Sequence, residues 1–170
     1  MADLVTDAFR NELGTDISIM VGGNVRNMFD KGDITFREAL SVLPFGNEAA
    51  IIKASGQQIK DALEMGAMKY PDAFGAFMQV SGMSYEIADD IPSSVKLDSN
   101  GLFVSVEGEY RVRNVMIGNE PLDVNKMYTV AGVDYTLLAS GDGLSMFKDC
   151  ESLLTSGKKI LKSLLNIWKR

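Results

Sequence analysis

The sequence of 170 residues contains no histidine, one cysteine and four prolines. Without histidine the chain lacks the usual general base, the Ser-His and Cys-His nucleophile pairs and the commonest transition-metal ligand. The single cysteine, Cys150, excludes an internal disulfide framework and a cysteine-rich zinc or iron–sulfur site, and we interpret it as a core side chain. Catalysis by this chain alone is therefore not expected.

Long apolar runs are also absent, because no stretch approaches the roughly 18 residues that a membrane-spanning helix needs. Met1 is not followed by a basic segment and an apolar one, so no signal peptide is visible. We expect either a cytoplasmic protein or a chain that begins inside a longer one. The net charge of −6 and the isoelectric point near 4.7 disfavour binding to nucleic acid or to an anionic membrane. An anionic ligand would have to be held by a few placed cations, which makes each arginine informative.

The composition fits one folded domain over residues 1–170. Hydrophobic residues make up 46% of the chain and charged residues 24%, which is typical of a globular domain with a sizeable core. The sequence shows neither an internal repeat nor a linker. A single domain is the expectation that follows.

The first half is predicted to alternate helices and strands. An amphipathic helix capped by Asp3 is expected to end at Gly14. Thr35 and Ser55 each precede a Glu or Gln by three residues, which is the capping-box spacing, so helices are expected from these residues to about 42 and 66. Strands are expected over residues 16–21 and 48–54.

The second half is predicted to be rich in strands and to close with a helix. The expected strands cover residues 77–87, 95–97, 102–106, 110–117 and 127–133. A hairpin turn is expected at residues 118–121, a tight turn at 140–143, and helical periodicity returns over 153–170. This order of helices and strands predicts an α+β domain.

Five short motifs, in order along the chain, resemble those of a known family. Gly22-Gly-Asn-Val-Arg26 followed by Val42-Leu-Pro-Phe-Gly-Asn47 resembles two paired signatures, Asn-Gly-Gly-Gly-Ile-Arg and Leu-Pro-Phe-Gly-Asn. These belong to the C-terminal domain of the family of 5'-nucleotidases, UDP-sugar hydrolases and 2',3'-cyclic-nucleotide phosphodiesterases. The family's opening helix, central strand and closing Gly-Gly-Asp-Gly turn are similar to residues 4–8, 79–82 and 141–143.

The resemblance implies a four-layer α/β/β/α domain that binds the nucleoside end of a nucleotide. In this family an N-terminal metallophosphoesterase domain holds two divalent metal ions on Asp, Asn and His ligands. The present chain is therefore expected to carry neither catalytic residues nor metal ligands. The full-length protein is expected to be a two-domain phosphoester hydrolase that is secreted, periplasmic or attached to the cell envelope.

The resemblance also indicates which residues bind the phosphate and the base. Arg26 is expected to grip phosphate, because a planar guanidinium can donate two parallel hydrogen bonds while the N–H groups of Gly22 and Gly23 assist. Phe45 matches an aromatic that stacks on the base, and Asn47 matches an amide that can hydrogen-bond to it. The alternatives are a surface charge pair for Arg26, a core position for Phe45 and a turn-stabilising role for Asn47.

The ribose and the second face of the base are assigned to the last third of the chain. Asp142 lies between two glycines, where a carboxylate can accept hydrogen bonds from two vicinal ribose hydroxyls; the alternative is an ordinary turn aspartate. The family's second stacking aromatic lies six residues earlier, where this sequence has Thr136. We expect Tyr135, the nearest aromatic, to take its place. Val21 and Asn24 also depart from the family's first Asn and third Gly.

Two other functions remain open at this stage. One is a free-standing module that captures nucleosides or nucleotides without hydrolysis, which the upstream sequence of the gene would decide. The other is divergence towards cyclic-nucleotide phosphodiester, UDP-sugar or thiosulfate-ester chemistry, because three positions depart from the family pattern. Retention of Phe45 and Tyr135 argues against thiosulfate-ester chemistry, since such a substrate offers no base to stack.

Overall fold

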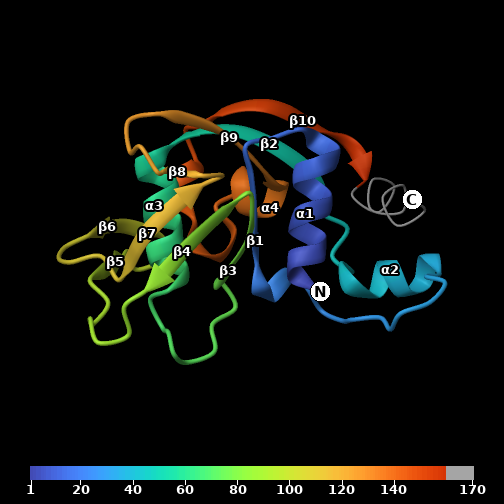
Figure 1. Ribbon diagram of the computed structural model, residues 1–170, viewed down its shortest axis with the longest axis horizontal. Helices are drawn as coiled ribbons and strands as arrows, with labels where there is room; N and C mark the ends of the chain where they lie inside the picture. The colour runs from blue at the N-terminus through green and yellow to red at the C-terminus, as the bar shows by residue number, and fades with distance from the viewer. Residues whose placement is uncertain (160–170) are drawn as a thin grey trace.

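The computed structural model describes the backbone of residues 1–159 and the side chains of residues 1–154. A five-stranded mixed sheet forms its centre, with helix α1 (Ala2–Leu13) on one face and helix α3 (Gly56–Gly66) on the other (Figure 1). Two smaller antiparallel sheets lie on the α3 side. Within the described residues, no helix is both long and apolar enough to cross a bilayer.

The remaining elements are short. The other α-helices are α2 (Phe36–Val42) and α4 (Asp134–Leu137), and the 3-10 turns are η1 (Gly22–Asn24), η2 (Gly141–Gly143) and η3 (Ser145–Phe147). The strands are β1 (Ile17–Val21), β2 (Glu48–Ser55), β3 (Met78–Ser81), β4 (Met83–Ile87), β5 (Val95–Leu97), β6 (Phe103–Val106), β7 (Val112–Ile117), β8 (Glu120–Pro121), β9 (Met127–Val133) and β10 (Glu151–Lys159).

The large sheet has the strand order β10-β2-β9-β1-β3. Strands β1 and β9 are parallel, and the other neighbouring pairs are antiparallel. Every residue of β1 is buried, as expected for a strand that is covered on both faces. The smaller sheets have the orders β4-β7-β8 and β5-β6.

Two clusters of buried apolar side chains lie between the large sheet and the elements that cover it. The larger one joins the large sheet to α3 and to the smaller sheets, and it includes Ile19, Ile52 and Leu63. The smaller one joins the opposite face of the sheet to α1 through Phe9 and Met20. The predicted α+β class is thereby confirmed, whereas the four-layer order of α/β/β/α remains a prediction.

Local signals placed several helix ends correctly. At Thr35 and Ser55 both hydrogen bonds of the predicted capping box are present. Gly14 ends α1 in the left-handed conformation, at φ +64°. The prediction that Asp3 caps this helix is wrong, because α1 begins at Ala2 and Asp3 lies in the first turn, where a negative charge favours the helix dipole.

Two predictions failed where pairing between distant segments decides the structure. Residues 77–87 form two strands, because Gly82, at φ +77°, interrupts the extended conformation. Strand β3 before it joins the large sheet, and strand β4 after it joins a smaller one. The final helix predicted from residue 153 is wrong up to residue 159, where β10 instead hydrogen-bonds to the edge of β2. The rest of that prediction, residues 160–170, lies outside the described residues.

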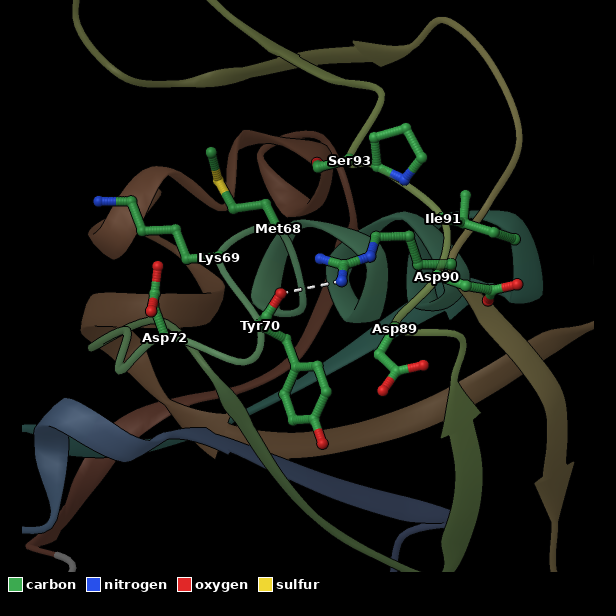
Figure 2. A pocket seen from close by; sticks show the side chains of 10 residues that line it. Met68, Lys69, Tyr70, Asp72, Asp89, Asp90, Ile91 and Ser93 are labelled. Carbon is green, nitrogen blue, oxygen red and sulfur yellow. Dashed lines mark hydrogen bonds between the residues drawn. The ribbon is translucent and has the colours of Figure 1, made fainter.

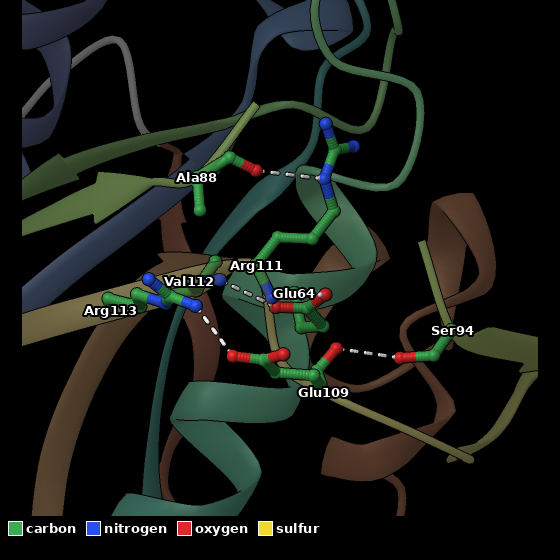
Figure 3. A network of polar contacts seen from close by, with 7 residues as sticks. All are labelled: Glu64, Ala88, Ser94, Glu109, Arg111, Val112 and Arg113. Atoms are coloured by element: carbon green, nitrogen blue, oxygen red, sulfur yellow. Dashed lines mark hydrogen bonds and ion pairs between the residues drawn. The ribbon is translucent and has the colours of Figure 1, made fainter. Parts of the chain in front are cut away.

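A buried carboxylate ties α3 to β7 (Figure 3). Glu64 is fully buried and accepts hydrogen bonds from the backbone N–H groups of Arg111, at 3.0 Å, and Val112, at 2.8 Å. The Arg111 guanidinium donates to the carbonyls of Ala67, at 2.9 Å, and Tyr70, at 2.8 Å, just beyond the end of α3. The pair therefore satisfies both the start of β7 and the free carbonyls at the helix end.

Glu64→Gln should destabilise the fold. The amide retains only one acceptor oxygen, so one buried N–H group would lose its partner and the other would lose a charged one. We expect the free energy of unfolding to fall by about 1.5 to 3 kcal/mol in urea titrations. The control is Glu107→Gln, at an exposed carboxylate 3.9 Å from Lys96, which should change it by less than about 0.5 kcal/mol. Equal effects of the two changes would contradict this account.

Candidate functional site

The predicted residues meet at one end of the large sheet. Residues 22–26 follow the C-terminal end of β1, and residues 134–142 follow the same end of β9, because these strands are parallel. Residues 44–47 precede the start of β2, which runs antiparallel to β9 and therefore begins at that end. Strands β2, β9 and β1 are neighbours, so three segments distant in sequence converge there.

A hydrogen bond fastens two of these segments together. The Asp134 carboxylate accepts from the backbone N–H of Glu48 at 3.0 Å and from that of Tyr135 at 2.8 Å. Ala49 and Val133 face each other in the sheet, so the chain enters β2 opposite the point where it leaves β9. Sequence reasoning missed Asp134. A carboxylate at the start of a short helix is the only signal that could have indicated it.

Two aromatic side chains project outward from these segments. Phe45 is 58% exposed and Tyr135 is 42% exposed. The core alternative for Phe45 is therefore wrong. The neighbouring Thr136 is fully buried, so of this pair only Tyr135 is accessible to a ligand. Both residues lie in the short helix α4 and not in a strand. Successive side chains on a helix point in directions about 100° apart, so Tyr135 can face outward while Thr136 faces the core.

Tyr135 and the turn around Asp142 form one packed unit. A Cβ atom on Gly141 would overlap the Tyr135 ring, so the ring lies directly on the backbone there. The backbone N–H of Asp142 donates to the Tyr135 hydroxyl at 3.3 Å. Although the Asp142 side chain is exposed, partial burial of its carboxyl group raises its pKa above the ordinary value. The structure thus places the backbone of Asp142, the predicted ribose-binding residue, against Tyr135, the predicted base-stacking residue.

The glycine turn differs from expectation. The N–H groups of Gly22 and Gly23 donate to the carbonyls of Phe77 and Gly75, each at 2.8 Å. Direct donation by these groups to a phosphate, as predicted, is therefore not what the geometry offers. A Cβ atom on Gly23 would lie 3.2 Å from the Gly75 oxygen, so glycine allows η1 to pack closely on residues 75–77.

Arg26 lies beside Phe45. Its guanidinium carbon is 5.9 Å from the centre of the Phe45 ring, which is within cation–π range. Its side chain is exposed and donates to the Gly23 carbonyl at 3.3 Å. Among the described residues, no carboxylate forms an ion pair with Arg26, which argues against the charge-pair alternative. Asn47 is half-buried, directly before β2.

A separate hollow of about 760 Å³ lies beyond the C-terminal end of α3, between residues 68–72 and residues 89–93 (Figure 2). Its lining includes Arg111 but none of the seven predicted residues. The Arg111 guanidinium already donates to backbone carbonyls, and Asp72, Asp89 and Asp90 line the same hollow. Lys69 also lines the hollow, but the three carboxylates outnumber it, so a phosphate would find little attraction there. Nowhere in the described part of the chain do three or more Asp, Glu or Cys side chains gather to hold a metal ion.

Comparison with known sequences decides the family. The sequence model of the 5'-nucleotidase C-terminal domain matches residues 1–149. The chain belongs to this family. It is 34% identical over 158 residues to the trifunctional nucleotide phosphoesterase protein YfkN of Bacillus subtilis, covering 88% of the chain and 9% of that protein. It is 31% identical over 157 residues to protein UshA of Yersinia enterocolitica, covering 92% of the chain and 24% of that protein.

Solved structures show the same domain within larger chains. The 5'-nucleotidase precursor from Thermus thermophilus superposes with a TM-score of 0.82 at 28% identity, over 99% of this chain and 32% of that one. The NAD nucleotidase of Haemophilus influenzae gives 0.77 at 26% identity, over 99% and 29%. This 5'-nucleotidase C-terminal domain therefore spans about a third or less of each of these relatives.

The exposure of Phe45 generates a stability prediction. Phe45→Ala should change the free energy of unfolding by less than about 1 kcal/mol, because an exposed ring leaves no cavity when removed. Phe147→Ala is the matched comparison, since Phe147 is 1% exposed and its loss should cost about 3 to 5 kcal/mol. Urea titration of both variants checks this. A comparably large loss for Phe45→Ala would place that ring in the core after all.

Proposed function

We propose that this chain is the nucleotide-recognition domain of a two-domain, metal-dependent phosphoester hydrolase of the 5'-nucleotidase type. The observation that carries the proposal is the pair of exposed aromatics, Phe45 and Tyr135, held at one end of the sheet by the pairing of β2 with β9. A single exposed ring is common on a protein surface, but these two come from segments that converge at one end of the sheet, and every nucleobase offers a flat face for an aromatic ring to stack on.

The neighbouring polar groups fit the rest of a nucleotide. Asp142, beside Tyr135, would accept hydrogen bonds from the ribose hydroxyls, and Asn47 would bind the edge of the base. Arg26, with no carboxylate partner among the described residues, would bind phosphate. Gly22 and Gly23 would contribute by fixing the turn that carries Arg26, because their own N–H groups are already bonded.

The phosphoester would be cleaved elsewhere. Two divalent metal ions, held by an N-terminal metallophosphoesterase domain, would stabilise the attacking and leaving oxygens. The residues of this chain would bind and orient the nucleoside so that its phosphate faces that domain. Accordingly, we do not expect the chain alone to hydrolyse AMP when manganese, zinc or cobalt is supplied. An extracytoplasmic location of the whole protein remains a prediction, as does the absence of nucleic-acid binding.

Calorimetric titration tests this function. The chain should bind adenosine and AMP, with ribose 5-phosphate binding much more weakly because it offers no base. Phe45→Ala should weaken adenosine binding by about 1 to 3 kcal/mol, the usual value of stacking on one aromatic. The same variant should leave the weak binding of ribose 5-phosphate nearly unchanged. Equal affinities for AMP and ribose 5-phosphate would contradict a base-reading site.

Arg26→Ala tests whether Arg26 contacts the phosphate or the base of the nucleotide. This variant should weaken AMP binding by about 1.5 to 3 kcal/mol, the range for hydrogen bonds to charged groups, because it loses a contact to phosphate. Adenosine binding should change less. Arg37→Ala is a control, since Arg37 is an exposed arginine of the neighbouring helix α2. If Arg26→Ala weakens AMP and adenosine equally, Arg26 serves the loop structure and not the phosphate.

A further inference from the structure

The turn that presents Asp142 is held in an uncommon conformation. Ser140 and Asp142 have φ angles of +56° and +52°, in the left-handed region that non-glycine residues rarely adopt. Gly143 follows at φ +85°. Such a conformation persists only where neighbouring groups support it. The direction of the Asp142 carboxylate therefore depends on the contacts that surround this turn.

Tyr135 supplies two of those contacts. Its ring rests on the backbone of Gly141, where a Cβ atom would overlap it. Its hydroxyl accepts the hydrogen bond of the Asp142 backbone N–H at 3.3 Å. The first contact limits how the turn can rotate, and the second provides the acceptor for the N–H of the residue whose side chain would face the ribose.

Only one face of the Tyr135 ring is available for stacking on a base. Because Gly141 covers one face, stacking is confined to the face that leaves Tyr135 42% exposed. Asp134 fixes the start of this segment by accepting the Tyr135 N–H at 2.8 Å. The Tyr135 ring, the turn at residues 140–143 and the Asp134 carboxylate are therefore linked by contacts that form without a ligand.

We propose that Tyr135 is a positioning residue for Asp142 in addition to being a stacking platform, so that its hydroxyl sets how strongly the site distinguishes ribose from 2'-deoxyribose. This inference rests on the proposed function. A phenylalanine would retain the ring on Gly141 but would leave the Asp142 N–H without this acceptor. The turn would then hold the carboxylate less firmly towards the ribose hydroxyls, while the stacking face would be kept.

The test compares adenosine with 2'-deoxyadenosine by calorimetry. The unaltered chain should bind adenosine more tightly, and Tyr135→Phe should reduce that preference by about three- to tenfold, as expected for one hydrogen bond. Asp142→Asn should reduce the preference as well. The double variant should lose little more than Asp142→Asn alone, because both changes act through one contact. Tyr85→Phe, which removes a different hydroxyl bonded to the Met78 carbonyl, should leave the preference unchanged.

The other outcomes overturn the inference in distinguishable ways. If Tyr135→Phe keeps the full preference, or weakens both nucleosides equally, the hydroxyl does not position Asp142, although the proposed function still stands. If the unaltered chain binds both nucleosides equally, Asp142 does not read the ribose and the inference is wrong. If it binds neither, the proposed function itself fails.

Discussion

Strand β2 pairs with β9 along its length, from Ala49 opposite Val133 to Ser55 opposite Met127. This antiparallel ladder places residues 44–47 and residues 134–142 at the same end of the sheet, although the two segments are more than eighty residues apart in sequence. The bond from the Glu48 N–H to the Asp134 carboxylate extends the ladder by one more contact, up to the residues that would touch a ligand. Ile52 and Val130 of these strands are fully buried in the main core, so the site rests on strands that belong to that core.

The distribution of charge has consequences for how such a site would work. A chain of net charge −6 does not attract an anion by its general field, so a local cation has to compensate. Arg26 is exposed and lies 5.9 Å from the centre of the Phe45 ring. A base that stacks on Phe45 must therefore share that ring with the guanidinium or displace it. Contacts to base and to phosphate are physically coupled in this arrangement.

Local chemistry made part of this structure predictable. The capping boxes at Thr35 and Ser55 depend on residues three positions apart, and both formed as expected. The motif around Phe45 predicted a ring that stacks on a base; the ring is exposed, and the stacking itself stays a prediction. Sequence alone could not show that the N–H groups of Gly22 and Gly23 donate to the carbonyls of Phe77 and Gly75. Those hydrogen bonds form only when η1 packs on a loop that is distant in sequence.

The failed prediction of a final helix and two features that sequence analysis missed share the same physical cause. Residues 153–159 have helical periodicity, but the open edge of β2 offers backbone partners, and β10 takes them. The role of Asp134 likewise depends on Glu48, which only the sheet brings near. Burial of Glu64 beneath β7 is a third case, since nothing in its local sequence separates it from an exposed helical glutamate.

The central claim is that one base contacts both aromatic rings at the end of the β2–β9 ladder. Nuclear Overhauser effects in a complex of this chain with AMP measure that directly. With Phe45 and Tyr135 assigned through leucine substitutions, the adenine H2 and H8 protons should show contacts to both rings in the same complex. Contacts to neither ring, or to residues lining the hollow beside Arg111, would contradict the account.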